Sequence, residues 1–141
     1  MLDYESQKPF DLIIAVQPQD IDRLEHVNNL VYVRWIQEAA EAHWSKYATP
    51  SQLESILWVV IRHEIDYKYS AKLGDTAIVR TWVGKAERNT FERHTEIFRQ
   101  SDMRLLAKAR SLWCPIDSQR LRPIRVAPEV YRQWTTSENN L

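Results

Sequence analysis

The alternation of hydrophobic and polar positions predicts one long helix in the first third of this chain. From Asn28 to about Tyr47, apolar residues recur at intervals of three and four, as they do on the buried face of a helix. The recurring positions are Val31, Trp35, Ala39 and Ala42, with Ile36 and Ala40 beside them. Because alanine side chains allow close packing, we expect a sheet to wrap around this helix.

Most of the remaining chain is predicted to form β-strands. Residues 61–69 alternate strictly, with Ile61, His63, Ile65, Tyr67 and Tyr69 on an apolar face and charged residues on the other. In chain order, strands are expected at residues 10–16, 61–69, 76–83, 91–99 and 103–114. The short turns between the last four favour antiparallel pairing, and Gly74 supplies the positive φ that one of them needs. Residues 51–54 are expected to form a linker, and Pro128 to begin a short closing helix.

This order of elements predicts an α+β domain that spans residues 1–141. A five-stranded antiparallel sheet wrapped around one long central helix, the hot-dog fold, satisfies it, because the helix then buries its apolar side on the concave face. One edge of such a sheet stays open, and open edges invite pairing with another chain. We therefore expect a homodimer or a homotetramer.

Composition and charge exclude several classes of function. The 141 residues hold 19 basic and 19 acidic side chains, so the formal charge is zero and nucleic acid is a poor candidate partner. Two glycines against six tryptophans leave no Gly-rich phosphate loop. The single Cys114, the absence of a long apolar run and the polar N-terminus predict a cytoplasmic protein without a membrane span.

Polar residues crowd into the ten positions before the predicted helix. Asp22 precedes the helix, His26 follows four residues later, and Asn28 and Asn29 stand at the helix start. Unpaired N–H groups at a helix N-terminus can polarise a carbonyl oxygen, and a nearby carboxylate can act as a nucleophile or general base. Helix capping alone explains the same residue types equally well. The spacing does not decide between these interpretations.

The stretch D-I-D-R-L-E-H-V-N-N-L-V-Y-V-R-W, residues 20–35, resembles a known signature. It is similar to D-x-D-x-x-(G/Q)-H-V-N-N-x-x-Y-x-x-W of hot-dog thioesterases of the 4-hydroxybenzoyl-CoA thioesterase type, and to plant acyl-ACP thioesterases. The resemblance implies hydrolysis of an acyl thioester, carried by CoA or by an acyl carrier protein. It implies no metal and no redox cofactor, with CoA entering as part of the substrate.

The resemblance also implies roles for single residues. Asp22 matches the catalytic carboxylate, the backbone N–H of Asn29 matches the donor to the thioester carbonyl, and His26 matches a histidine frequent in this branch. Asn28, Tyr32 and Glu25 are the expected neighbours of the substrate. Glu25 stands where Gly or Gln is usual, which places a second carboxylate near the site. We expect it either to change the geometry of the turn or to raise the pKa of Asp22 by like-charge repulsion.

A turn further along the chain is expected to hold the phosphates of CoA. Lys85, Arg88 and Arg93 surround it, and the turn resembles the one that the family uses for the CoA nucleotide. Arg88 is our first choice among the three. A solvated charged hairpin is the plainer alternative.

Two further functions remain open from the sequence. Because Glu25 departs from the family pattern, one alternative is a hot-dog domain that binds an acyl thioester or another protein without hydrolysing it. A hot-dog hydratase or dehydratase ranks lower, since such enzymes resemble D-x-N-P-x-H, whereas Asp22 and His26 are four residues apart with no proline between them. The histidines carry no metal-site spacing, and we expect His63 to be a core residue.

Overall fold

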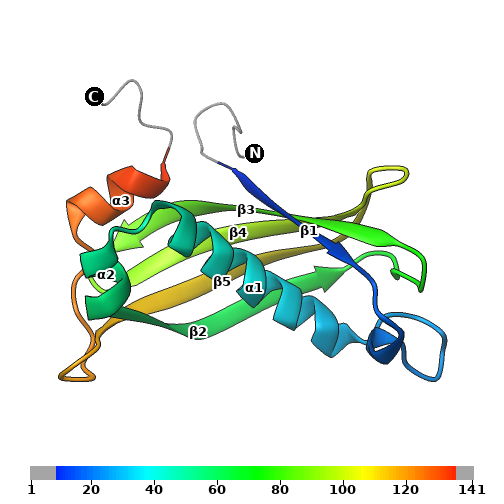
Figure 1. The fold of residues 1–141 in the computed structure, drawn as a ribbon, viewed down its shortest axis with the longest axis horizontal. Coiled ribbons are helices and arrows are strands. Elements are labelled where there is room, and N and C mark those ends of the chain that lie inside the picture. The colour runs from blue at the N-terminus through cyan, green and yellow to red at the C-terminus, as the bar shows by residue number, and fades with distance from the viewer. Residues whose placement is uncertain (1–8, 136–141) are drawn as a thin grey trace.

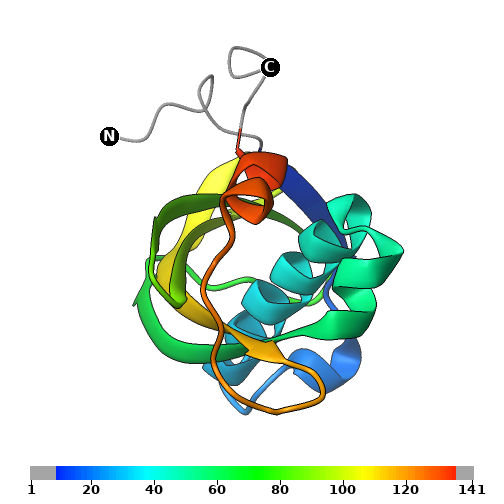
Figure 2. The same cartoon turned by 90° about the vertical axis from the view of Figure 1, so that its left-hand side faces the viewer.

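A curved five-stranded antiparallel sheet enclosing one long helix forms the body of the protein (Figures 1 and 2). The computed structural model describes residues 9–135. Its strands are β1 (Phe10–Ala15), β2 (Ile56–Tyr67), β3 (Thr76–Glu87), β4 (Thr90–Arg99) and β5 (Arg104–Asp117). Its helices are a short 3-10 turn (Pro18–Asp20), α1 (Asn29–Tyr47), α2 (Pro50–Ser55) and α3 (Pro128–Trp134). The strand order β1-β3-β4-β5-β2, all antiparallel, confirms the predicted hot-dog fold.

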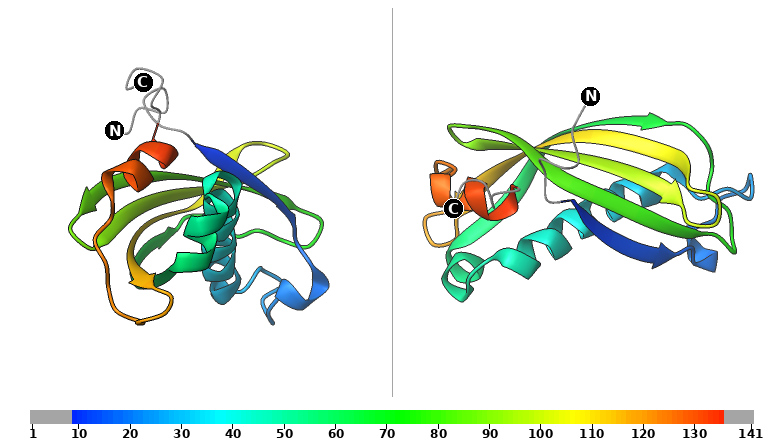
Figure 3. Two further views of the ribbon diagram at one scale, coloured as in Figure 1. Left: turned by 60° about the vertical axis from the view of Figure 1, so that its left-hand side comes forward. Right: turned by 90° about the horizontal axis from the view of Figure 1, so that it is seen from above.

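Helix α1 lies in the concavity of the sheet (Figure 3). Most of its apolar face is buried, and Ala42 is half-buried. Trp35, Ile36 and Ala39 have no exposed surface, and they pack with strand residues such as Val79 and Leu106. This is the face that the three-and-four spacing predicts. The position of the helix start is thereby fixed relative to the sheet.

The chain between α1 and the second strand was predicted wrongly. Residues 51–54 are not a linker but part of α2, where Thr49 accepts a hydrogen bond from the Gln52 N–H and Pro50 occupies the first turn. Strand β2 begins at Ile56, five residues before the predicted start. The continuous apolar run over residues 56–61 lacks the alternation that identifies a strand facing solvent on one side.

Three strand predictions need further correction. A bulge between Val60 and Arg62 shifts the register of β2, so Ile61 is 55% exposed and does not share the buried face of His63. Strand β5 does not end at Cys114 but continues through Pro115, which lies opposite Trp58. Strand β3 continues to Glu87, four residues past its predicted end, and β2 stops at Tyr67, so Tyr69 lies outside the strand. Strands β1 and β4 and helix α3 each begin within one residue of the predicted start.

Both edges of the sheet are open within residues 9–135. Strand β2 pairs only with β5, and β1 pairs only with β3. Among the helices that the structure describes, none has the length and apolar character needed to cross a membrane. The unpaired β2 edge extends over twelve residues and carries exposed apolar side chains, Leu57, Val59 and Ile61.

Candidate active site

A tight loop leads the chain from the 3-10 turn into helix α1. Ile21 and Val27 pair as an isolated antiparallel bridge, and the Asp22 N–H donates to the His26 carbonyl over 2.9 Å. Glu25 closes the loop with φ of 62°, a left-handed conformation that favours glycine. The loop therefore keeps a glycine-like turn although a glutamate occupies it, and the Glu25 side chain is exposed.

The Asp22 carboxylate is half-buried at the base of this loop. Its Oδ1 accepts the backbone N–H of Leu24 at 2.9 Å and, more weakly, that of His26 at 3.4 Å. Within residues 9–135, no protein group donates to its Oδ2. One oxygen thus fixes the orientation of the carboxylate, and the other is available to a substrate or a water molecule.

Helix α1 begins with a free backbone donor. Asn28 is the N-cap, and its Oδ1 accepts the N–H of Leu30 at 2.9 Å. Asn29 is the first helical residue, and its N–H has no acceptor in the part of the chain that the structure describes. This N–H carries part of the positive end of the helix dipole. The structure therefore leaves a backbone donor without an acceptor at the position where the sequence predicts an oxyanion donor, at the end of the loop bearing Asp22.

Asp20 stabilises the Asp22 loop through buried polar contacts. It is 1% exposed, and its carboxylate accepts from the Arg34 guanidinium at 3.0 Å and from the Gln17 N–H at 2.9 Å. Its carbonyl accepts the N–H of Asn28 over 2.9 Å. The hydrogen bond to Asp20 is the main cause that raises the pKa of Arg34. Asp20 is a positioning residue, because all its contacts are to the protein.

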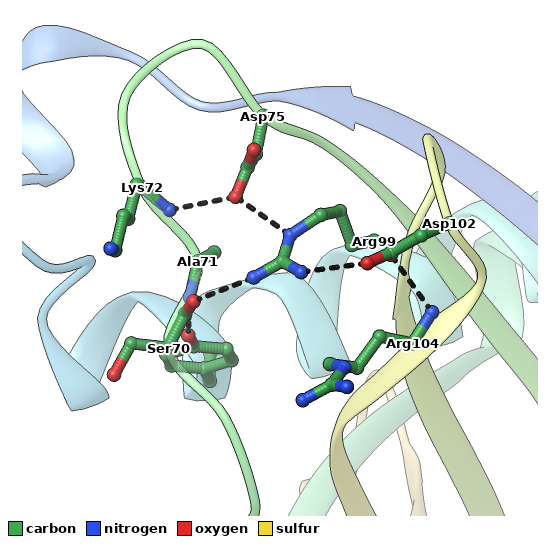
Figure 4. A network of polar contacts seen from close by, with 8 residues as sticks. Ser70, Ala71, Lys72, Asp75, Arg99, Asp102 and Arg104 are labelled. Carbon is green, nitrogen blue, oxygen red and sulfur yellow. Dashed lines mark hydrogen bonds and ion pairs between the residues drawn. The ribbon is translucent and has the colours of Figure 1, made fainter.

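A second loop, residues 68–75, contacts the Asp22 loop and is itself held by a network of polar contacts around Arg99 (Figure 4). The carbonyl of Ala71 accepts the Val27 N–H at 2.9 Å, and the Ala71 N–H donates to the Tyr32 hydroxyl at 2.8 Å. Arg99 ties this loop to the sheet through Asp75 at 3.1 Å and the Ser70 carbonyl at 3.2 Å. Arg99 therefore stabilises the Asp22 loop indirectly, because it holds the loop whose Ala71 bonds to Val27.

Loss of the Arg99 guanidinium is expected to loosen the Asp22 loop. The variant Arg99→Met leaves the Asp75 carboxylate and the Ser70 carbonyl without this donor, which should cost about 1–3 kcal/mol of unfolding free energy. We also expect kcat to fall, because the loop samples more conformations. Denaturant unfolding and steady-state kinetics measure the two effects.

The matched control is Arg132→Met, which removes an exposed guanidinium on α3, away from the Asp22 loop and from β2. Exposed charges of this kind contribute about 0–1 kcal/mol. Equal effects of the two substitutions on stability and turnover would show that Arg99 does not position the loop.

Tyr32 and His26 lie near the loop in different ways. Tyr32 is 2% exposed, and burial is the main cause that raises the pKa of its hydroxyl, which accepts from Ala71. Tyr32 therefore supports the loop, and its contact with substrate stays a prediction. His26 is half-buried, and its ring bonds to no other described residue. The ring is free to meet a substrate.

The predicted phosphate-binding turn lies at the other end of the molecule (Figure 1). Arg88 sits in the β3–β4 turn with φ of 42°, while the Asp22 loop adjoins the start of β3. Twelve strand residues separate the two places, which is about 40 Å in an extended strand. One chain alone therefore does not bring Arg88 to Asp22.

The two other basic residues of that turn differ in exposure. Lys85 is exposed and pairs with Glu87 at 2.7 Å. Arg93 is buried and bonds to His43 and Thr81, so the expectation that it helps to hold phosphates at the surface is wrong. On strand β4, residues alternate between the two faces, and Arg93 falls on the concave one.

Several supporting residues escaped sequence reasoning. Tyr67 donates to the Asn29 carbonyl at 3.3 Å, Arg34 holds Asp20, and Arg99 holds the 68–75 loop. Helical spacing places Arg34 on a polar face and strand alternation assigns Tyr67 a face, but neither pattern names a partner. No group of three or more metal-ligating side chains occurs in the described chain.

Comparison with known proteins agrees with this fold. A sequence model of the Thioesterase-like superfamily matches residues 16–134. No curated protein sequence is similar enough to count as a match. Among solved structures, a 4-hydroxybenzoyl-CoA thioesterase complexed with 4-hydroxybenzoyl-CoA is 18% identical, with a TM-score of 0.80 over 89% of this chain and 98% of that one.

Two further structures have the same architecture. A 1,4-dihydroxy-2-naphthoyl-CoA thioesterase from Synechocystis is 18% identical, with a TM-score of 0.76 over 89% of this chain and 95% of that one. A 12:0-ACP thioesterase from Umbellularia californica is 19% identical, with a TM-score of 0.74 over 89% of this chain and 49% of that one. At these identities the likeness shows the fold. The family match over residues 16–134 confirms the predicted enzyme class, a thioester hydrolase, and the chain belongs to the Thioesterase-like superfamily.

Proposed function

We propose that this protein hydrolyses acyl-CoA thioesters at the start of helix α1. The observation that carries the proposal is the unshared N–H of Asn29 at the end of the loop that presents Asp22. A thioester carbonyl oxygen that accepts from this N–H gains stabilisation as negative charge develops on it. The carboxylate Oδ2 of Asp22 supplies the second group that hydrolysis requires.

Two chemical routes suit this arrangement. Asp22 can attack the carbonyl carbon and expel the CoA thiolate, and water then cleaves the mixed anhydride. Alternatively, Asp22 takes a proton from a water molecule that attacks the same carbon. In both routes the Asn29 N–H stabilises the tetrahedral oxyanion, and the products are a carboxylic acid and free CoA.

Three other residues predicted from the sequence lie in or beside the Asp22 loop. His26 has a free ring next to the loop, and Asn28 sets the helix start, while Glu25 borders the loop from the solvent side. The proposed reaction draws on no metal or redox cofactor, and CoA enters only as part of the substrate. A cytoplasmic location stays a prediction.

We further propose that a complete site needs two copies of the chain. The Tyr67 end of β2 contacts Asn29, whereas its Ile56 end lies beside α2, near the β3–β4 turn that bears Arg88 (Figure 1). A two-fold axis that pairs two β2 edges makes them antiparallel. The Asn29 end of one copy then lies beside the Ile56 end of its partner, and this pairing moves Asp22 toward the partner's Arg88.

A charge placed on β2 is expected to dissociate the assembly. Val59 is 47% exposed on this edge strand, so Val59→Lys should convert a dimer or tetramer into smaller species and lower turnover. Analytical ultracentrifugation measures the mass of the species. The matched control is Ile13→Lys, which is 51% exposed on the opposite edge strand, β1. Dissociation by the control but not by Val59→Lys would assign the interface to β1.

Release of free thiol from a panel of substrates tests the proposed activity. Suitable probes are aliphatic acyl-CoAs of graded length, 4-hydroxybenzoyl-CoA, and a 12:0 acyl chain on CoA and on an acyl carrier protein. We expect thiol release from at least one CoA thioester. Hydrolysis of the acyl-carrier-protein thioester alone would contradict CoA as the carrier, and hydration of an enoyl-CoA without thiol release would contradict hydrolysis.

A further inference from the structure

A cavity of about 340 Å³ lies between the C-terminal half of α1 and the sheet. Its most prominent lining residues are aromatic: Trp44, Trp58, Phe91, Trp113 and Trp134. Helix α1 has 19 residues, so its two ends are about 28 Å apart, and the cavity lines the end away from Asn29. The cavity is thus distinct from the Asp22 loop of the same chain.

Arg93 is a buried cation on the wall of this cavity. It is 8% exposed, and its Nη1 bonds to His43 Nδ1 at 2.9 Å and to Thr81 Oγ1 at 3.0 Å. Among the described residues, no carboxylate lies within ion-pair distance of Arg93. Burial lowers the pKa of Arg93 to about 9, so the guanidinium stays charged at neutral pH. A buried charge without a counter-ion is costly to the free protein.

The other polar groups of the wall include two donors without an acceptor and two carboxylates, one held by cations and one at the solvent-exposed side. The indole N–H groups of Trp58 and Trp113 are buried and have no acceptor among the described residues. The carboxylate of Glu92 is held by Arg110, by His94 and by a backbone N–H. Glu41 is exposed to solvent. The cavity therefore combines an apolar interior with a cation and two donors that lack an acceptor.

We propose that this cavity binds an apolar carboxylate, with the carboxylate group beside Arg93 and the apolar body among the tryptophans. A carboxylate supplies both the missing counter-charge and acceptors for charge-assisted hydrogen bonds. The flat indole and phenyl surfaces favour an aromatic body. Ligands enter past Leu53, which lines the cavity, is 44% exposed and lies on α2, outside the proposed β2 interface. Binding of this kind does not depend on the proposed hydrolysis.

Isothermal calorimetry with a matched pair of probes tests the proposal. Naphthalene-2-carboxylate carries the charge, and naphthalene-2-carboxamide has the same shape without it. We expect the wild type to bind the carboxylate at least about tenfold more tightly than the amide, since a charged hydrogen bond outweighs a neutral one. Arg93→Met should abolish that difference. Equal affinity of the wild type for both probes, or binding of neither, would overturn the proposal.

A second variant guards against a folding defect in Arg93→Met. Ala40 lines the cavity from α1, so Ala40→Leu should fill part of it and weaken both probes together. Thermal unfolding of each variant shows whether it is folded. Unchanged affinity of folded Ala40→Leu for both probes would place their binding elsewhere and overturn the proposal.

The carboxylate can arrive as a free acid or as the far end of an acyl group. Inhibition kinetics with naphthalene-2-carboxylate separate these sources. A rise in the KM for acyl-CoA with unchanged kcat identifies the cavity as part of the acyl site, and an unchanged KM identifies a separate site for free acids. Both results uphold carboxylate binding. Calorimetry requires no turnover, so failure of the proposed hydrolysis leaves the binding test intact.

Discussion

Replacement of Asp22 by asparagine is expected to lower kcat/KM for acyl-CoA by about 10²- to 10⁴-fold, the range for loss of a general base. Asparagine keeps an Oδ1 that can accept the Leu24 N–H, so the loop should retain its shape. What disappears is the negative oxygen that attacks the thioester or takes a proton from water. The measurement is the initial rate of thiol release over a range of substrate concentrations.

Glu25→Gln is the matched control for this experiment. Glu25 lies three residues from Asp22 in the same loop and has the same charge, but its side chain is exposed and forms no hydrogen bond or ion pair within residues 9–135. We expect Glu25→Gln to retain turnover. If Glu25→Gln loses activity and Asp22→Asn keeps it, the reacting carboxylate has been assigned to the wrong residue.

Replacement of Asn29 by proline should remove the oxyanion donor without removing the helix. Proline lacks the N–H and is favoured in the first turn of a helix. Asn28, with φ of −61° and ψ of 139°, already has the extended conformation that a residue before proline prefers. Loss of one oxyanion donor is expected to lower kcat by about 10²- to 10³-fold.

Asn29→Ala separates the backbone from the side chain at this position. Alanine keeps the N–H, so we expect Asn29→Ala to retain most of the turnover that Asn29→Pro loses. Circular dichroism of both variants checks that α1 is intact. Equal turnover by the folded alanine and proline variants would mean that this N–H does not contact the reacting carbonyl.

The sequence predicts most of the fold because most elements here have a clear period. The face of α1 bearing Trp35 and Ala39 is buried as its spacing predicts, and the tight turns force the antiparallel order. The strand at residues 56–60 was missed because its residues are apolar on both faces. One face turns toward the helix, and the other is exposed on an edge strand, where Leu57 and Val59 lie.

Only part of the candidate site can be predicted from the sequence. Asp22 and the start of α1 follow from a local pattern of capping residues, since both lie within one short stretch. The support given by Arg99 and Ala71 depends on pairing between residues about 45 to 70 positions away from the loop. Side-chain direction also decided the outcome for Arg93, which strand alternation turns into the core. The alternation along the predicted strand 91–99 places Arg93 on the same face as Phe91 and Ile97, so that outcome has a local signal. The contacts of Arg99 and Ala71 follow from tertiary packing and have none.

Single-turnover reaction with enzyme in excess over one acyl-CoA is the most direct test of thioester hydrolysis at Asp22 and Asn29. The wild type should release one thiol and one carboxylic acid for each thioester consumed, while Asp22→Asn binds the same thioester and leaves it largely intact. Recovery of unchanged thioester from the wild type, after binding has been demonstrated for every substrate of the panel, would contradict the proposed reaction.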